Sequence, residues 1–342
     1  VINIQYTGEW FPQKAVHPKV ASLQSWNHLS NIVEDRRNRL WLGGVGGAFR
    51  VDLTEKKVHP LVPDSVAGDH PLFYGVGAIL EDAGGLIWLG TRGNGLLKFN
   101  DNARRFAPGL WKGESIRALY KTTDGRVWVG TNVGGIYWLD PETGQLQPIV
   151  RHESLFRKDK GVCTSFLQDH SGALWATAGD WGLLKITDWQ SGNLRLEVAR
   201  PATPLPWTLF SGPRKIVEDP KTGILWIASQ DDLRRYDPQS GAIESFPFFN
   251  HDFARNDRNL FPVLFLDRSR RLWCGTSEGL FRFDAAKKTF QRLQNDRKNP
   301  ASLAHNLVKC IAEDPAQPER YLWIGTGGGL NRFDTETGAF EK

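Results

Sequence analysis

The sequence predicts an all-β fold, a seven-bladed β-propeller with four-stranded antiparallel blades. Three observations predict it. A tryptophan inside a short apolar run recurs seven times along the 342 residues. Each copy contains short apolar runs bounded by Gly, Asp and Pro, which is typical of a four-stranded blade. Windows of about 11–18 residues show no helical periodicity.

The recurring tryptophans give the period of the repeat. Successive ones lie 40 to 51 residues apart, a period typical of propeller blades. In such an array each unit packs mainly on its neighbours, so a long chain does not need one large core. We therefore expect a single propeller over residues 1–342, with one motif residue in each blade: Trp41, Trp88, Trp128, Trp175, Trp226, Trp273 and Trp323.

The first predicted strand of each copy is an apolar run that ends in an acidic residue. A turn with Asp and Gly usually follows it, and both residues favour tight turns. The third copy differs and ends "YKTTDG". The other six predicted first strands are residues 31–35, 78–82, 165–169, 215–219, 264–267 and 310–314.

The second predicted strand carries the tryptophan, as in "LWLG", and a glycine-rich turn joins it to a third strand of the type "GLFRFD". A looser fourth run follows, as at 241–248 and 288–293. An aromatic residue at one place in every copy indicates packing between blades rather than a ligand platform. A cation recurs in the third strand and, with the acidic residues of the first, predicts ion pairs within or between blades.

Charge and cysteine content exclude several classes of function. The net charge is +5, but six cations are distributed one per copy rather than in a stripe, and no nucleic-acid module is present. We therefore expect no nucleic-acid partner. Cys274 and Cys310 lie in apolar strands and are expected to be buried thiols, while the cysteine and histidine spacings predict no metal site and no cofactor. Membrane contact is expected only through segments outside this chain.

The repeat is irregular in the turns between the second and third strands and in the connections between copies, which are expected to share one face. Aromatic rings beside amides and carboxylates suit a carbohydrate, and Arg92, Arg157 and Lys160 could bind a uronate or a sulfate. Ordinary loop positions are the alternative. The predicted ligand-binding residues are Trp26, His28, Tyr74, Arg92, Asn94, Asn132, Arg157, Asp180, Trp181, Trp207, Asp231, Glu278 and His305.

An enzyme is the competing class, because propeller lyases and glycoside hydrolases use paired carboxylates or histidines. His28 and His305 precede the first strands of the first and last copies, which would be neighbours in a closed propeller. Asp180, Asp231 and Asp232 could form a carboxylate cluster for glycoside cleavage. Neither set forms a recognised motif, so no catalytic residue is predicted and the segment is interpreted as non-catalytic. A pure protein-interaction platform is the third possibility.

The pattern "EDxxGxLWIGTxxGLxRFD" resembles the two-component regulator propeller repeat, found in extracytoplasmic sensor regions of bacterial hybrid two-component regulators and related signalling proteins. The match is strongest at 264–284 and 310–334 and weaker at 174–188 and 225–237. The resemblance implies a periplasmic or extracytoplasmic ligand sensor, part of a longer membrane-anchored protein. It also implies a glycan fragment or another small polar ligand, with signalling through a conformational change or homodimerisation.

Overall fold

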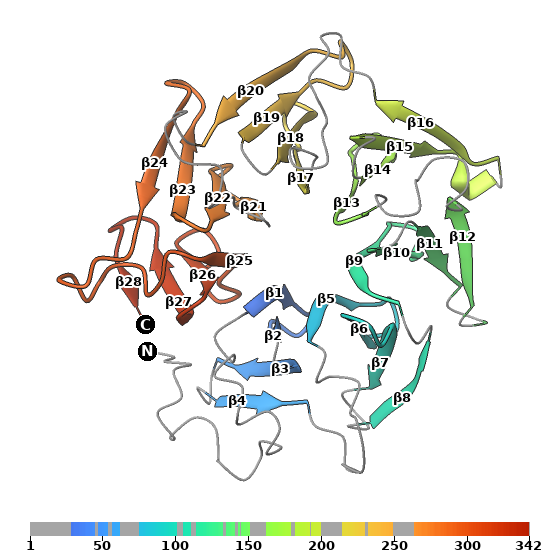
Figure 1. The fold of residues 1–342 in the computed structure, drawn as a ribbon, viewed down its shortest axis with the longest axis horizontal. Coiled ribbons are helices and arrows are strands. Elements are labelled where there is room, and N and C mark those ends of the chain that lie inside the picture. The colour runs from blue at the N-terminus through green and yellow to red at the C-terminus, as the bar shows by residue number, and fades with distance from the viewer. Residues whose placement is uncertain are drawn as a thin grey trace. The chain divides into compact units, whose positions relative to one another are not determined.

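The computed structural model confirms the predicted all-β, seven-bladed β-propeller. Its seven sheets each have four strands, hydrogen-bonded in chain order (Figure 1). The chain divides into two compact units, residues 1–116, 278–280 and 292–342, and residues 117–277 and 281–291. The structure describes residues 29–44, 47–53, 57–61, 75–100, 105–110, 114–132, 135–140, 143, 145–150, 162–178, 182–191, 193–199, 214–229, 232–248 and 263–341.

The first unit carries blades 1, 2 and 7. Blade 1 consists of β1 (Leu29–Glu34), β2 (Leu40–Gly44), β3 (Gly47–Asp52) and β4 (Lys57–Pro60). Blade 2 consists of β5 (Val76–Glu81), β6 (Ile87–Thr91), β7 (Leu96–Asn100) and β8 (Arg105–Leu110). Blade 7 consists of β25 (Val308–Glu313), β26 (Tyr321–Thr326), β27 (Gly329–Asp334) and β28 (Phe340–Glu341).

The second unit carries blades 4 and 5 and most of blades 3 and 6. Blade 3 consists of β9 (Ile116–Lys121), β10 (Val127–Thr131), β11 (Ile136–Leu139) and β12 (Leu146–Val150). Blade 4 consists of β13 (Phe166–Gln168), β14 (Leu174–Thr177), β15 (Leu183–Thr187), the 3-10 helix η4 (Trp189–Ser191) and β16 (Arg195–Ala199). Blade 5 consists of β17 (Lys215–Asp219), β18 (Ile224–Ala228), β19 (Asp232–Tyr236) and β20 (Ile243–Pro247). Blade 6 consists of β21 (Val263–Leu266), β22 (Leu272–Thr276), β23 (Gly279–Asp284) and β24 (Thr289–Leu293).

The motif tryptophans pack between blades, as predicted. Trp41 of blade 1 is fully buried and meets Phe99 of blade 2 edge-on, with ring centroids 6.1 Å apart. Trp175 of blade 4 meets Tyr236 of blade 5 in the same way at 6.0 Å. Truncating such a side chain to alanine typically costs about 3–5 kcal/mol. These tryptophans are therefore core residues and not a ligand platform.

In blades 1, 2, 4 and 6 the acidic residue that ends the first strand holds the tryptophan of its own blade. The Asp35 carboxylate accepts a hydrogen bond from Trp41 Nε1 at 2.8 Å and caps the intervening turn through the amide of Arg39 at 3.0 Å. In blade 3 the hydroxyl of a threonine takes the place of this carboxylate. The same carboxylate–indole contact joins Asp82 to Trp88, Asp169 to Trp175 and Asp267 to Trp273.

Four of the six recurring cations of the third strand lie over the tryptophan of their own blade: Lys98, Lys185, Arg282 and Arg332. Lys98 Nζ lies 5.0 Å from the Trp88 ring centroid, a cation–π distance. Arg332 does make the predicted pair, with its Nε 2.7 Å from Asp314 Oδ2. A cation stacked on the indole is therefore a recurring contact, and in blade 7 it occurs together with the ion pair.

The residue before the aspartate joins neighbouring blades. Gln168 Oε1 of blade 4 accepts a hydrogen bond from the backbone amide of Thr123 in blade 3 at 2.8 Å. Glu218 of blade 5 accepts one from His170 of blade 4 at 2.9 Å. In the first unit, Glu81 of blade 2 likewise accepts one from the amide of Arg36 in blade 1 at 2.8 Å. This position therefore links each of these turns to the next blade.

All three cysteines are free and buried, which confirms the expectation for Cys274 and Cys310. Burial raises the pKa of Cys310 to about 12. The thiol is therefore protonated at neutral pH and behaves as a small apolar side chain.

Candidate functional site

Eight of the predicted ligand-binding residues lie outside the described residues, and five lie inside them. The five are placed as predicted, in turns between second and third strands or just before a first strand: Arg92, Asn94, Asn132, Glu278 and His305. The eight outside are Trp26, His28, Tyr74, Arg157, Asp180, Trp181, Trp207 and Asp231.

Two of the five residues are fixed by an arginine of their own blade. Glu278 accepts a hydrogen bond from Arg292 Nη2 at 2.6 Å, and Asn132 Oδ1 accepts one from Arg117 Nε at 3.0 Å. Each contact ties a turn to a strand of the same sheet. These side chains therefore have a structural role, and ligand binding by them stays a prediction.

His305 lies over the glycine turn of blade 7. Its ring is exposed, and Nδ1 accepts a hydrogen bond from the amide of Leu307 at 3.0 Å. A Cβ atom on Gly327 would lie 2.9 Å from that nitrogen. The turn is rich in glycine because the imidazole occupies the space that a side chain would need.

The remaining two residues belong to the turn between β6 and β7. The amide of Asn94 donates to Thr91 Oγ1 at 3.0 Å, a contact that shapes the turn. Arg92 is exposed, and its backbone amide donates to Gly75 O at 3.1 Å. Its Nε lies 3.9 Å from the position that a Cβ atom on Gly77 of β5 would take.

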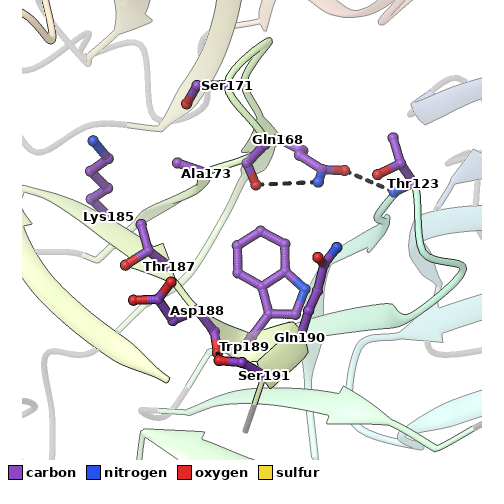
Figure 2. Close-up of a pocket in the computed structure, with 11 residues that line it drawn as sticks. Thr123, Gln168, Ser171, Ala173, Lys185, Thr187, Asp188, Trp189, Gln190 and Ser191 are labelled. Carbon is purple, nitrogen blue, oxygen red and sulfur yellow. Dashed lines mark hydrogen bonds between the residues drawn. The ribbon is translucent and has the colours of Figure 1, made fainter. Parts of the chain in front are cut away.

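A cavity of about 440 Å³ lies in blades 3 and 4, at the turns that join first strands to second strands. This end of the blades is opposite to the turns between second and third strands. The sequence did not predict this cavity. Figure 2 shows its residues, which come from the turn after β9, from β13 and the turn after it, from β15 and from η4. They are Thr123, Gln168, Ser171, Gly172, Ala173, Lys185, Thr187, Asp188, Trp189, Gln190 and Ser191.

The amide of Gln168 is held across the two blades (Figure 2). Its Oε1 accepts from the amide of Thr123 at 2.8 Å, and its Nε2 donates to Gly172 O at 3.3 Å. Its backbone amide donates to the Tyr120 hydroxyl at 2.9 Å. The carbonyl oxygen and the NH₂ group of the Gln168 side chain are therefore both held in place by hydrogen bonds to the backbone.

Trp189 is one of the residues that line the cavity (Figure 2), but its side chain is buried and belongs to the core between blades 3 and 4. The backbone turns into η4 at Asp188, whose φ of 58° is left-handed, an uncommon conformation outside glycine. The indole then packs edge-on against Trp128 at 5.8 Å, and Nε1 donates to Asp124 Oδ2 at 3.2 Å. These contacts fix the ring between blades 3 and 4.

The polar groups of the cavity are of mixed charge. Lys185 Nζ lies 5.4 Å from the Trp175 ring centroid, and Asp188 Oδ2 lies 3.3 Å from Arg195 Nε. The hydroxyls of Thr123 and Thr187 add donors and acceptors. One ammonium, one carboxylate, an amide and hydroxyls can hydrogen-bond to a polyhydroxylated ligand.

The enzymatic alternatives find limited support in the described residues. Asp232 is buried, accepts from Arg234 Nε at 2.8 Å and from Ser245 Oγ at 2.5 Å, and so has a structural role. Its proposed partners Asp180 and Asp231, and His28 of the histidine pair, lie outside the described part of the chain. Within that part, no group of three or more His, Cys, Asp or Glu side chains could hold a metal ion.

Among the described residues, no helix combines the length and the apolar character needed to cross a membrane.

Comparisons with known proteins agree with the fold and the repeat. Residues 111–133 match the family described as "Two component regulator propeller", and no curated protein matches the chain. The extracellular domain of BT4673 from B. thetaiotaomicron, described as a hybrid two component system, has a TM-score of 0.74 and 19% identity over 91% of this chain and 38% of that chain. That of BT3049, another such system from B. thetaiotaomicron, has a TM-score of 0.68 and 18% identity over 90% and 40%.

A third similar structure is an enzyme. Virginiamycin B lyase from Staphylococcus aureus has a TM-score of 0.65 and 14% identity over 89% of this chain and 93% of that chain. At such low identity these likenesses show the fold alone, and this chain spans about two fifths of the BT4673 and BT3049 chains. The chain is a seven-bladed β-propeller that carries the two-component regulator propeller repeat.

Proposed function

We propose that this chain is the ligand-sensing propeller of a bacterial transmembrane signalling regulator and lies outside the cytoplasm. The repeat and the likeness to extracellular domains of hybrid two component systems support this proposal. The observation that carries ligand binding is the cavity of blades 3 and 4, where Gln168, Lys185 and Trp189 converge (Figure 2).

The ligand proposed for this cavity is a neutral oligosaccharide or a similar small polar molecule. Its volume lies within the usual range of small-molecule sites, roughly 300–1,000 Å³. A sugar offers hydroxyls for the Gln168 amide and the Lys185 ammonium.

The same cavity suggests how binding could be transmitted. Gln168 belongs to blade 4, and its hydrogen bond to the amide of Thr123 links it to blade 3. A ligand that competes for this amide would alter the contact between two blades. Differential contacts of this kind are what a ligand needs in order to shift a conformational equilibrium. We propose a conformational or dimerisation signal as the output.

The test is calorimetric titration of the purified chain with a panel of neutral oligosaccharides. Lys185→Met is expected to weaken binding about tenfold, as the loss of one charged hydrogen bond would. Lys98→Met is the matched control, because Lys98 stacks on Trp88 at the same register of blade 2. Equal affinity of Lys185→Met and wild type would exclude the cavity, and no binding by any member of the panel would contradict the sensor proposal.

The same samples test the alternatives. Release of shortened or unsaturated sugars would favour a hydrolase or a lyase, the class to which the likeness to virginiamycin B lyase draws attention. Self-association of the protein in the absence of any sugar would favour a protein-interaction platform.

A further inference from the structure

The turn between β13 and β14 of blade 4 is held by both neighbouring blades. On one side, Gln168 Oε1 accepts a hydrogen bond from the amide of Thr123 in blade 3 at 2.8 Å. On the other side, the amide of His170 donates to Glu218 Oε2 in blade 5 at 2.9 Å, and the His170 ring contacts the same carboxylate. Because Gln168 and His170 are two residues apart, one short turn connects blades 3, 4 and 5.

The same turn is a wall of the cavity. Ser171, Gly172 and Ala173 line the cavity together with Gln168 (Figure 2). Gln168 Nε2 donates to Gly172 O at 3.3 Å, which ties this side chain to the wall. His170 belongs to the turn but is not one of the lining residues. It can therefore act on the cavity only through the turn that carries it.

His170 is the titratable form of a contact that blade 1 makes with a permanent cation. Arg36 occupies the corresponding place in the turn of blade 1, directly after the aspartate. Its amide donates to Glu81 Oε2 of blade 2 at 2.8 Å, and its Nε lies 3.4 Å from the same oxygen. His170 and Glu218 repeat this arrangement in blades 4 and 5 with an imidazole in place of the guanidinium. An imidazole loses its charge near neutral pH, whereas a guanidinium does not, so the contact of His170 depends on pH and that of Arg36 does not.

The groups around His170 favour its charged form. The hydrogen bond and the charge of Glu218 on β17 raise the pKa of His170, and Asp169 of the same turn adds to the shift. Gly223, in the turn after β17, carries no charge and packs against the ring, since a Cβ atom on it would lie 2.9 Å from His170 Cε1. The Glu218 charge also reaches Tyr120 of β9, whose phenol stays neutral because burial raises its pKa. The ring is therefore a group whose charge changes above the ordinary histidine pKa, about 6.5.

We propose that His170 is a pH-dependent positioning residue for the cavity: its protonated ring fixes the turn against blade 5, and the cavity then binds a neutral sugar more tightly. The sugar in this inference rests on the proposed function, but the effect of His170 on the turn does not. Loss of the charge weakens the contact with Glu218, and a wall that is less fixed must be ordered when a ligand binds. By linkage, sugar binding raises the pKa of His170 in return.

The first measurement needs no sugar. NMR signals of the Gln168 side-chain amide, the Gly172 amide and the His170 ring are followed from about pH 5.5 to about pH 8.5. In wild type all three are expected to change with one midpoint, because the turn follows the charge of the ring. In His170→Arg the Gln168 and Gly172 signals are expected to stay constant over this range. If these two signals do not titrate with the ring in wild type, the proposal is overturned.

The second measurement is calorimetric titration with maltotriose, cellotriose and xylotriose at both ends of this pH range. For a sugar that binds, the affinity of wild type is expected to fall about fivefold as the pH rises, at the low end of couplings between sites. The effect is small because the His170 side chain is 58% exposed. His170→Arg is expected to keep at every pH the affinity that wild type has in acid, and His170→Gln to show the weaker affinity throughout. His59→Gln on β4 of blade 1 is the control and is expected to retain the pH dependence of wild type.

The outcomes separate this proposal from the proposed function. An affinity of wild type that does not change with pH, or an equal pH dependence of wild type and His170→Arg, would overturn the role of His170. Failure of all three sugars to bind would contradict the proposed ligand, and the NMR titration would then decide the role of His170 alone. If His170→Gln does not fold, the comparison of wild type with His170→Arg still tests the proposal.

Discussion

Trp41 Nε1 donates a 2.8 Å hydrogen bond to Asp35 Oδ2, six residues earlier in the chain. The other carboxylate oxygen caps the turn between them, accepting from the amides of Arg37 and Arg39 at 2.9 and 3.0 Å. One side chain thus sets the turn and anchors the residue that packs against blade 2. In blades 1, 2, 4 and 6 the recurring aspartate and tryptophan are hydrogen-bonded to each other, so the repeated phrase describes a structural unit.

Asp35→Ala is expected to lower the free energy of unfolding by about 2–3 kcal/mol, since it leaves the buried Trp41 N–H unpaired. Urea denaturation measures this change. Burial acts to raise the pKa of Asp35, but hydrogen bonds from Arg39, Trp41 and backbone amides outweigh it and lower that pKa. The contribution of Asp35 is therefore present above the ordinary pKa, about 4, and lost as the pH falls further. Glu197→Ala, at an exposed carboxylate, is the control. An equal effect of both substitutions would contradict the role of Asp35.

Trp41→Phe is expected to destabilise the protein by about 1–2 kcal/mol more than Trp323→Phe. Both indoles are buried, but Trp323 Nε1 has no hydrogen-bond partner in the described part of the chain. In blade 7 the turn is longer, and Asp314 accepts from Arg332 at 2.7 Å instead. Phenylalanine at position 41 removes an N–H that is hydrogen-bonded to Asp35, whereas phenylalanine at position 323 removes an N–H that has no partner in the described part of the chain. Equal losses in urea denaturation would show that the indole–carboxylate bond adds little.

The fold could be predicted because the same pattern of strands and turns occurs seven times in the sequence. The period, the turn residues and the apolar runs all indicate a four-stranded blade, and each blade buries its apolar faces against its neighbours. The partner of the recurring cation was less predictable. Lys98 and Asp82 have matching periods and opposite charges, yet Asp82 binds Trp88 and Lys98 stacks on the same ring. Periodicity identifies residues that recur together but not which of them are in contact.

The candidate sites were less predictable for a related reason. Arg92 was identified as a candidate because it departs from the glycine of other copies. The cavity of blades 3 and 4 depends on Trp189, which lies outside the motif. The one signal for it was "TDWQSG", with a tryptophan where the other copies have smaller residues. Such sites are formed by contacts between residues of different blades, and a local sequence pattern does not predict those contacts.

Gly90→Ala is expected to lower the free energy of unfolding by about 1–3 kcal/mol through overpacking. A Cβ atom on Gly90 of blade 2 would lie 2.7 Å from Ile116 Cγ2, at the start of blade 3. Blade 5 has Ala228 at the equivalent position, so the motif itself tolerates alanine. Urea denaturation of Gly90→Ala, Ile116→Ala and the double variant tests the contact. Because Ile116→Ala removes the clashing methyl, the double variant should be less destabilised than the sum, and strict additivity would contradict the clash.

The stability of the protein is expected to depend on pH through His170 of blade 4 and Glu218 of blade 5. The His170 ring contacts the Glu218 carboxylate, and this hydrogen bond and charge raise the pKa of His170. A raised pKa in the folded state gives stability that is fully present below the ordinary histidine pKa, about 6.5, and lost as the pH rises through the raised value. Glu218→Gln keeps an acceptor for the His170 amide but removes the charge.

Unfolding free energies measured between about pH 5.5 and pH 8.5 should therefore fall more steeply with pH for wild type than for Glu218→Gln. Glu244→Gln is the control, because it also removes a carboxylate, one that pairs with Lys288 at 2.6 Å on an exposed strand. NMR titration of the His170 ring measures its pKa directly. If that pKa stays the same in Glu218→Gln, the contact between blades 4 and 5 is not the source of the pH dependence, because the charge that raises it would have been removed without effect.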